Sequence, residues 1–588
     1  DEVIEKIEPL VTQAKVMTQK YHITVTNPPY MGNRRMVDSL KKYANEKYPN
    51  AKSDLFAMFI KKSISFTKQN GFIGLVTPFV WWFISSYEDL RKIVLNNTTI
   101  TSLIQLEYNA FEGATIPVGT FVLRNQKTLT KGEYIKLSDF SGIEMQPLKV
   151  LEAIKNPKVY YRYRKNQDNF MQIPGNPIAF WVSDNFISAF SQNKKINDLY
   201  ETRKGMFTGN NNYFLKKWYE INNNTVGNNF KFYNKGGGYR KWYGNNDTVI
   251  RWHNDGYEVK NFKGSGGINE SYFYKKCLTW NLVSSTTPFC CRALDENFVM
   301  GDAGPVCLIN DDNYNYILGF INTNICNYFM NVLNPTLNIP PGVVGKLPIK
   351  NSNLYKNRID EIVSQNIIIA KVDWNSFETS FDFKIHPILL CKETKPISTI
   401  CQGFDNYRKY TNMQFIQLKS NEEELNRIFI DIYGLADELT PEVVDNDITI
   451  TKVVEKKTAK DKKNSYVIDK PEVIKSFISY AVGCMFGRYS LDEEGLIYAG
   501  GKFDVSRFKT FIPTRDNILV IADDDYFEDD IVSRFVEFVK ITFGEETLEE
   551  NLDYIAESLG QRASETARQT IRRYFLKDFY KDHVKTYK

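Results

Sequence analysis

The chain has 588 residues, 42% of them hydrophobic, and a net charge of +5 at neutral pH. This length predicts several domains, each with its own core, and the charge is too small to indicate nucleic acid by itself. No apolar stretch is long enough to span a membrane. We therefore expect no membrane anchor. The eight cysteines and four histidines form no cluster with metal-ligand spacing, so we expect no bound metal and a reducing, cytoplasmic location.

Residues 1–145 show alternating helix and strand patterns. The predicted helices cover residues 3–20, 54–69 and 87–95, and the predicted strands cover 21–26, 72–76, 103–106 and 120–123. Continuous apolar strands between helices predict a sheet covered on both faces, with 21–26 as a buried parallel strand. The segment 79–84, Phe-Val-Trp-Trp-Phe-Ile, is too short for a membrane span and indicates a buried or groove-lining segment.

The tetrapeptide Asn27-Pro28-Pro29-Tyr30 follows the first strand directly. Two prolines stiffen the turn, and the Pro28 carbonyl is left without a ladder partner. The Asn27 amide offers an acceptor and a donor, and Tyr30 offers a flat face for stacking. Together these groups are suited to hold an exocyclic amine and the ring that carries it. The alternative is that Asn-Pro is only a turn signal.

Residues 146–350 are rich in asparagine, glycine and aromatic residues. Three short clusters interleave aromatic rings with cations: residues 160–165, which include Arg162 and Arg164; Lys216-Lys217-Trp218-Tyr219; and Arg240-Lys241-Trp242-Tyr243. Cations that neutralise phosphates beside stacking rings favour a DNA-binding cleft. The alternative is a set of solvated loops in which the cationic stems cover apolar surface.

Residues 351–588 have a mainly helical pattern, with one clear helix over 422–433. The acidic run at 523–530 resembles a two-metal site at first sight. It is better explained as the negatively charged cap of a helix that starts near Asp530, so no metal is predicted there. The sequence predicts no mechanism for this region.

The tetrapeptide resembles the catalytic loop of the methyltransferases that modify adenine N6 in DNA. Ser53-Asp54-Leu55-Phe56 is similar to the next motif of that family, and residues 71–78 resemble its following strand. Residues 205–211, 240–245, 334–338 and 423–429 are similar to the specificity region of one branch, the PglX methyltransferases of BREX phage-defence systems. The resemblance covers nearly the whole chain.

This resemblance implies an α/β fold with three parts. Residues 1–145 would be the C-terminal portion of a Rossmann-like methyltransferase sheet, 146–350 a mixed α+β target-recognition domain, and 351–588 a mainly helical C-terminal domain. It also implies a site-specific DNA adenine-N6 methyltransferase that uses S-adenosylmethionine and acts in phage defence.

The family's site residues carry over onto this sequence as follows. Asn27 and Pro28 would accept the two N6 hydrogens, with Pro29 completing the turn. Tyr30 and Phe111 would stack on the flipped adenine, and Asp54 and Leu55 would line the cofactor side. A core aromatic at position 111 and a helix cap at position 54 are the alternatives.

Only 26 residues precede Asn27, and none form the glycine-containing cofactor loop that these enzymes carry upstream. We therefore expect a fragment with half of its cofactor site. Two other functions stay open: a DNA-binding specificity module without activity, and an RNA or protein amino-methyltransferase. The expected partner is double-stranded DNA bound by a monomer, and other BREX defence proteins are candidate partners.

Overall fold

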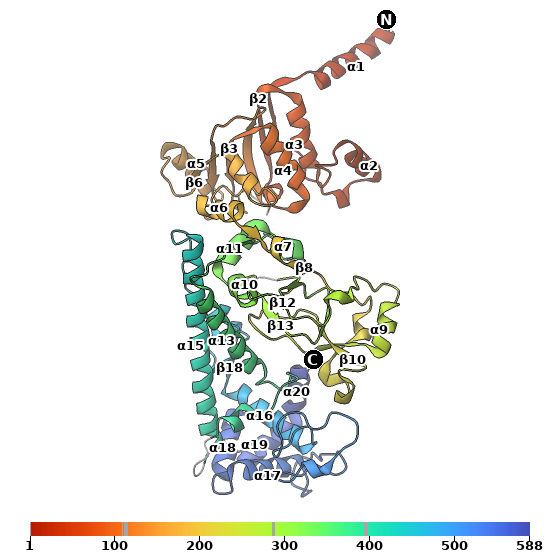
Figure 1. Ribbon diagram of the computed structural model, residues 1–588, viewed down its shortest axis with the longest axis vertical. Coiled ribbons are helices and arrows are strands. Elements are labelled where there is room, and N and C mark those ends of the chain that lie inside the picture. Colours follow the sequence, from red (N-terminus) through yellow and green to blue (C-terminus); the bar gives the residue numbers. More distant parts are fainter. Residues whose placement is uncertain (1, 109, 111–115, 285–287, 393–397, 588) are drawn as a thin grey trace.

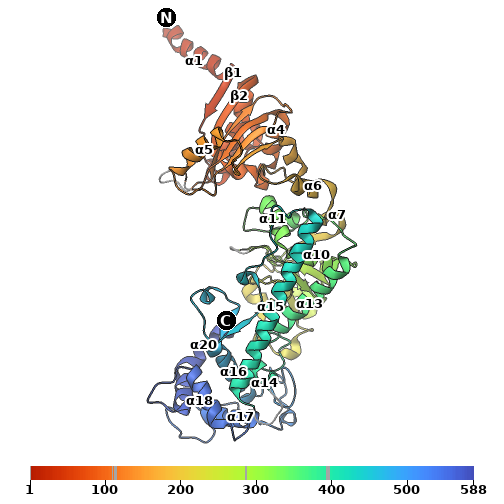
Figure 2. The same ribbon diagram turned by 90° about the vertical axis from the view of Figure 1, so that its left-hand side faces the viewer.

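The computed structural model describes residues 2–108, 110, 116–284, 288–392 and 398–587. They form three bodies arranged along one axis, with helix α1 (Glu2–Thr18) projecting from the first (Figures 1 and 2). By their cores, the first body comprises residues 21–180 apart from Ile173 and Ala179, which pack in the second core. The second body comprises residues 182–374 with 415–450, and the third 383–411 with 453–587. No helix of these described residues is long and apolar enough to cross a membrane.

The first body is built on a six-stranded sheet with the order β1-β2-β4-β3-β5-β6. These strands are β1 (Tyr21–Thr26), β2 (Thr67–Pro78), β3 (Thr99–Gln105), β4 (Val118–Arg124), β5 (Gly132–Lys136) and β6 (Arg162–Lys165). The pairings make β1, β2, β3 and β5 run in one direction, with β4 and β6 reversed. The predicted α/β class, with a mostly parallel sheet in the first part of the chain, is confirmed.

The helices of this body are α2 (Asp38–Lys47), α3 (Leu55–Phe66), α4 (Glu88–Asn97) and α5 (Met145–Lys155). All the elements predicted for residues 1–145 are present, with ends shifted by a few residues. The largest shift is at β2, which starts directly after α3 at Thr67 rather than at residue 72. Trp81, Trp82 and Phe121 are fully buried in the core against the sheet.

Strand β1 is parallel, as predicted, but it is not buried. Among the described residues it pairs with β2 alone and stands last in the strand order, and its Ile23 and Val25 are 64% and 75% exposed. An apolar run does not distinguish a central strand from an edge strand, because both can carry the same side chains. The prediction of burial was therefore wrong, although the position of the following turn was not affected.

The first body extends beyond the predicted boundary at residue 145. Strand β6 pairs antiparallel with β5, and Phe170 and Phe180 are fully buried in the same core. Most of residues 146–180 therefore belong to the first body, while Ile173 and Ala179 already pack in the core of the second.

The second body combines two small sheets with helices. One sheet has the order β14-β10-β11-β9 and the other β13-β12-β15-β8. Their strands are β8 (Glu201–Arg203), β9 (Leu215–Lys217), β10 (Phe230–Asn234), β11 (Thr248–Arg251), β12 (Cys277–Thr279), β13 (Arg292–Leu294), β14 (Phe298–Met300) and β15 (Val306–Leu308), with a two-stranded pair β7 (Lys194–Lys195) and β16 (Pro348–Ile349). The helices are α6 (Asp184–Gln192), α7 (Ile196–Leu199), α8 (Asn211–Phe214), α9 (His253–Lys260), α10 (Tyr314–Ile321), α11 (Asn324–Leu333), α12 (Pro341–Val344) and α13 (Lys356–Trp374). The mixed α+β character predicted for this region is present.

The third body is mainly helical, as predicted. It contains α14 (Pro387–Leu390), α16 (Lys470–Met485), α17 (Ile531–Phe543), α18 (Leu548–Ser558), α19 (Ala567–Tyr574) and α20 (Tyr580–Tyr587), with a small pair of strands, β17 (Lys452–Val454) and β18 (Val467–Asp469). The predicted cap is confirmed: Oδ1 of Asp530 accepts a hydrogen bond from the Ser533 amide at 2.8 Å, and Arg572 pairs with the same carboxylate. No metal-ligand cluster occurs among the described residues.

One long helix, α15 (Ile400–Tyr433), runs from the third body into the second (Figures 1 and 2). Its first residues, including Ile400 and Phe404, lie in the third core, whereas Phe429 and Tyr433 lie in the second. The predicted domain boundary at residue 350 therefore does not mark the end of the second body, because α13 and the C-terminal half of α15 belong to that body.

Candidate active site

The turn Asn27-Pro28-Pro29-Tyr30 lies directly after β1, at the edge where β2, β3 and β5 also end. In open α/β sheets this carboxyl edge is where ligands bind. Pro28 is buried, Tyr30 is half-buried, and Asn27 and Pro29 are exposed. The sequence-predicted turn thus presents the Asn27 amide at the surface while its second residue anchors it.

Tyr30 fixes the Asn27 amide. Its hydroxyl donates to Oδ1 of Asn27 at 3.0 Å, and the carbonyl oxygen of Val76 lies within reach of the same hydroxyl at 3.3 Å. Burial raises the pKa of Tyr30, so the phenol remains a donor at neutral pH. The Tyr30 ring is held edge-on against Phe56, with centroids 6.1 Å apart.

Asp54 connects this turn to helix α3. Its Oδ1 accepts from the Phe56 amide at 3.2 Å, which caps the helix, and from the Met31 amide at 3.0 Å. The Leu55 amide donates to the Met31 carbonyl at 3.1 Å. The alternative of a helix cap at position 54 is confirmed, and the same carboxylate also clamps the residue that follows Tyr30. Phe111 lies outside the described residues.

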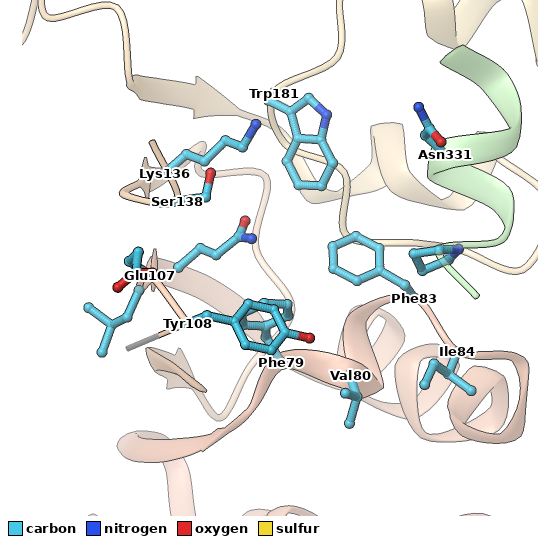
Figure 3. Close-up of a pocket in the computed structure, with 13 residues that line it drawn as sticks. Phe79, Val80, Phe83, Ile84, Glu107, Tyr108, Lys136, Ser138, Trp181 and Asn331 are labelled. Atoms are coloured by element: carbon cyan, nitrogen blue, oxygen red, sulfur yellow. The ribbon is translucent and has the colours of Figure 1, made fainter. Parts of the chain in front are cut away.

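A pocket of about 460 Å³ opens along the same edge of the sheet (Figure 3). It is lined by residues that follow β2, β3 and β5, among them Phe79, Tyr108 and Lys136, and by Asn331 and Pro335 of the second body. The pocket therefore lies where the first and second bodies meet.

Aromatic rings dominate the pocket wall. Phe79 meets Tyr108 edge-on at 6.3 Å, Phe83 lies 5.6 Å from Trp181, and Lys136 Nζ lies 5.1 Å from the Trp181 ring. The predicted groove-lining character of residues 79–84 is confirmed, because Trp81 and Trp82 are buried while Phe79 and Phe83 face the pocket. Sequence reasoning missed the contribution of Trp181, which no motif singles out.

Four of the predicted DNA-binding cations, those outside residues 240–243, lie on two different bodies. Arg162 and Arg164 are on β6 of the first body: Arg162 Nε lies 3.0 Å from Glu133 and its Nη1 donates to the Ala153 carbonyl, whereas Arg164 is largely exposed. Lys216 and Lys217 are on β9 of the second body, where Lys217 pairs with Asp247 at 2.6 Å. Arg164 Nε lies 3.3 Å from Glu133 with its side chain 69% exposed, and Lys216 Nζ donates to the Asn212 carbonyl at 3.2 Å.

The cluster Arg240-Lys241-Trp242-Tyr243 is buried, and every member is at least 94% inaccessible. Arg240 Nη2 pairs with Asp373 at 2.8 Å, while Lys241 Nζ and Trp242 Nε1 bind the two oxygens of Glu422 at 2.7 and 2.8 Å. Burial raises the pKa of Glu422, and the Lys241 ammonium opposes that shift. The predicted phosphate-binding role of this cluster is corrected: its cations neutralise carboxylates of α13 and α15 inside the second body.

Comparison with known proteins shows which protein families and relatives this chain is similar to. The model described as Eco57I restriction-modification methylase matches residues 2–111. The chain is 37% identical to the adenine-specific methyltransferase PglX of Lacticaseibacillus casei (strain Zhang), over 98% of this chain and 49% of that protein. The predicted resemblance to adenine-specific methyltransferases is confirmed. The adenine-specific methyltransferase BrxX of Escherichia coli O9:H4 (strain HS) is 34% identical over 95% of this chain and 46% of that protein.

The chain spans about half the length of the curated relatives it matches. Among solved structures, it is similar to the Type IIL restriction-modification enzyme MmeI in complex with DNA, at 12% identity and a TM-score of 0.42. That match covers 71% of this chain and 55% of MmeI.

Proposed function

We propose that this chain is the part of a site-specific DNA adenine-N6 methyltransferase that carries the catalytic turn and the DNA-recognition elements. The enzyme uses S-adenosylmethionine and marks host DNA in a BREX-type phage-defence system. The observation that carries the proposal is the Asn27-Pro28-Pro29-Tyr30 turn, which presents a fixed, exposed amide at the carboxyl edge of a parallel strand. The 37% identity to an adenine-specific methyltransferase supports it.

The turn can activate an aromatic amine. The N6 lone pair of adenine is delocalised into the ring, so the nitrogen is a poor nucleophile. Asn27 Oδ1 accepts one N6 hydrogen and the Pro28 carbonyl accepts the other, which localises the lone pair on nitrogen. Such acceptors help most in the transition state, where the nitrogen gains positive charge.

Tyr30 prepares Asn27 for this role. A hydroxyl has one hydrogen to donate, and the Val76 carbonyl offers it a second acceptor 3.3 Å away. An amide oxygen has two lone pairs, so Asn27 Oδ1 can accept an N6 hydrogen while the Tyr30 hydroxyl still orients the amide. The Tyr30 ring stacks on the base, which must leave the duplex to reach the turn. Phe111 is proposed as the second stacking ring.

The cofactor residues fit their proposed role. Asp54 and Leu55 stand at the start of α3, hydrogen-bonded to Met31 immediately after the turn, so they lie beside the reacting amine. S-adenosylmethionine supplies the sulfonium methyl group. Asp54 places a carboxylate next to the site of a positively charged methyl donor, which is electrostatically favourable.

Double-stranded DNA is the proposed substrate, with other BREX proteins as further partners of a monomeric enzyme. One recognition region in a monomer favours methylation of adenine in one strand of an asymmetric site, since palindromic sites mirror a two-fold dimer.

Long-read sequencing of host DNA, with and without the intact gene, tests this function. Gene-dependent adenine methylation in one strand is the expected result. Labelled-methyl transfer by the full-length protein to duplex DNA and to RNA separates the alternatives. Transfer to RNA alone would identify an amino-methyltransferase with another substrate. DNA binding without any methyl transfer would identify an inactive specificity module.

A further inference from the structure

The pocket lies on the same edge of the sheet as the catalytic turn, but none of the turn's four residues lines it. Its walls follow the ends of β2, β3 and β5, whereas Asn27 follows β1. Neighbouring strands lie about 4.8 Å apart, so the order β1-β2-β4-β3-β5 puts the β5 wall about 19 Å from β1. An adenine with N6 at Asn27 cannot also reach Lys136 and Ser138 at that wall.

The chemistry of the pocket suits a planar heterocycle. Phe79, Phe83, Tyr108 and Trp181 supply ring faces and edges, and Tyr108 is 54% exposed at the rim (Figure 3). Nucleic-acid bases stack on such rings whatever their sequence. Lys136 adds a cation over the Trp181 ring, where a phosphate can reach it.

Gln105 adds an unsatisfied polar group. It ends β3 and lines the pocket with only 8% of its surface exposed, and its Oε1 is buried without a hydrogen-bond partner among the described residues. A buried amide oxygen without a partner is costly, and a ligand that donates a hydrogen bond to it recovers that cost. A side-chain amide can pair with the edge of a base through both of its polar groups.

We propose that this pocket binds a second nucleobase of the DNA, distinct from the adenine that is methylated, by stacking on Trp181 and Phe79 and by hydrogen bonding to Gln105. Asn331 and Pro335 close it from the second body, so the subsite connects the recognition elements to the catalytic edge. The proposal rests on the proposed function for its DNA substrate. The base is either a neighbour of the target in the same strand or the partner base left behind on flipping.

The test uses the full-length protein and duplexes that carry its own methylation site. A fluorescent base, 2-aminopurine, replaces in turn the target adenine, each flanking base and the opposite base. We expect the parent protein to change the emission at one non-target position and Trp181→Leu to abolish that change. A flanking position identifies a same-strand neighbour, and the opposite position identifies the partner base.

Gln105→Leu should lower discrimination between bases at the same position by about tenfold, measured as relative methylation rates on substituted duplexes. Gln69→Leu, at the exposed opposite end of β2, is the matched control and should behave like the parent. Tyr108→Ala, at the exposed rim, should weaken the emission change at that position if Gln105→Leu fails to fold.

Emission changes confined to the target adenine, or non-target signals unaffected by Trp181→Leu and Tyr108→Ala, would overturn the subsite. In both cases the parent would still methylate DNA, whereas failure of the proposed function would show as absence of methyl transfer by the parent itself.

Discussion

The hydroxyl of Tyr30 donates a hydrogen bond to Oδ1 of Asn27 over 3.0 Å. The same oxygen is the acceptor that adenine N6 requires in the proposed reaction, and its second lone pair stays available for the base while the phenol orients the amide. This relationship makes separate predictions for the ring and for the hydroxyl of Tyr30.

Tyr30→Phe keeps the stacking ring and removes the hydrogen bond that orients the amide. Single-turnover methyl transfer should fall about fivefold, the effect of one neutral hydrogen bond, with unchanged affinity for DNA. Tyr30→Ala removes the ring as well and should lower the rate further. Equal rates for the two variants would mean that the ring takes no part in holding the base.

Asn27→Ala removes the proposed transition-state acceptor. In the full-length enzyme, single-turnover methyl transfer should fall by at least about 100-fold while DNA binding is retained. Asn45→Ala, at an exposed position on α2, is the control and should match the parent. A rate for Asn27→Ala within a few-fold of the parent would exclude the catalytic assignment.

Lys241→Ala leaves the Glu422 carboxylate buried without its cation. The free energy of unfolding should fall by about 3–5 kcal/mol, measured by urea denaturation. Lys384→Ala breaks a pair of similar length, 2.9 Å to Glu494, in which both side chains are about two-thirds exposed, and should leave the free energy of unfolding almost unchanged. Similar losses for the two variants would contradict a structural role for Lys241.

Arg164→Gln and Lys216→Gln should weaken DNA binding and reduce its salt dependence. Each lost phosphate contact lowers the slope of log affinity against log salt by about one unit. Lys384→Gln, in the third body, serves as the charge-matched control. An unchanged slope for either test variant would place that cation away from the DNA.

His386 should make the third body sensitive to acid. The side chain is buried, with Nε2 3.0 Å from Ser476 Oγ and Nδ1 accepting from the Ile388 amide, and burial lowers its pKa to about 3. The unfolded chain binds a proton near pH 6.5, so the stability from neutral His386 is complete above that pH and is lost as the pH falls toward 3.

At pH 5.5 the loss from this residue amounts to about 1 kcal/mol relative to pH 7.5. Urea denaturation at the two pH values should show it, and His386→Gln should reduce the difference. His253→Gln, at an exposed histidine, is the control and should leave the difference unchanged. If the free energy of unfolding of His386→Gln falls between pH 7.5 and pH 5.5 by as much as that of the parent, the acid sensitivity comes from other groups.

The sequence predicted a turn at residues 27–30 and the Asp530 cap, and gave the Asp54 cap as an alternative, because each depends on local chain geometry. It could not predict that Ile23 and Val25 of β1 are exposed in this chain, since the exposure of a strand is decided by pairing and packing over long distances. It also mistook Arg240 and Lys241 for surface cations. Their partners, Asp373 and Glu422, are more than 130 residues away, so the burial of these charges has no local signal.

The lining of the pocket also depends on contacts between residues that are far apart in the sequence. Residues 79–84 predicted an aromatic groove wall, but Trp181, Gln105 and Pro335 come together only when the first and second bodies pack. The domain boundaries at 145 and 350 were misplaced for a related reason: changes in composition along the chain do not coincide with the limits of the cores.

Helix α15 has a mechanical consequence. Its 34 residues form a rod about 50 Å long, with one end in each of two cores. A rotation of the second body therefore displaces the third body as a rigid lever, because this helix passes from one core into the other without a loop.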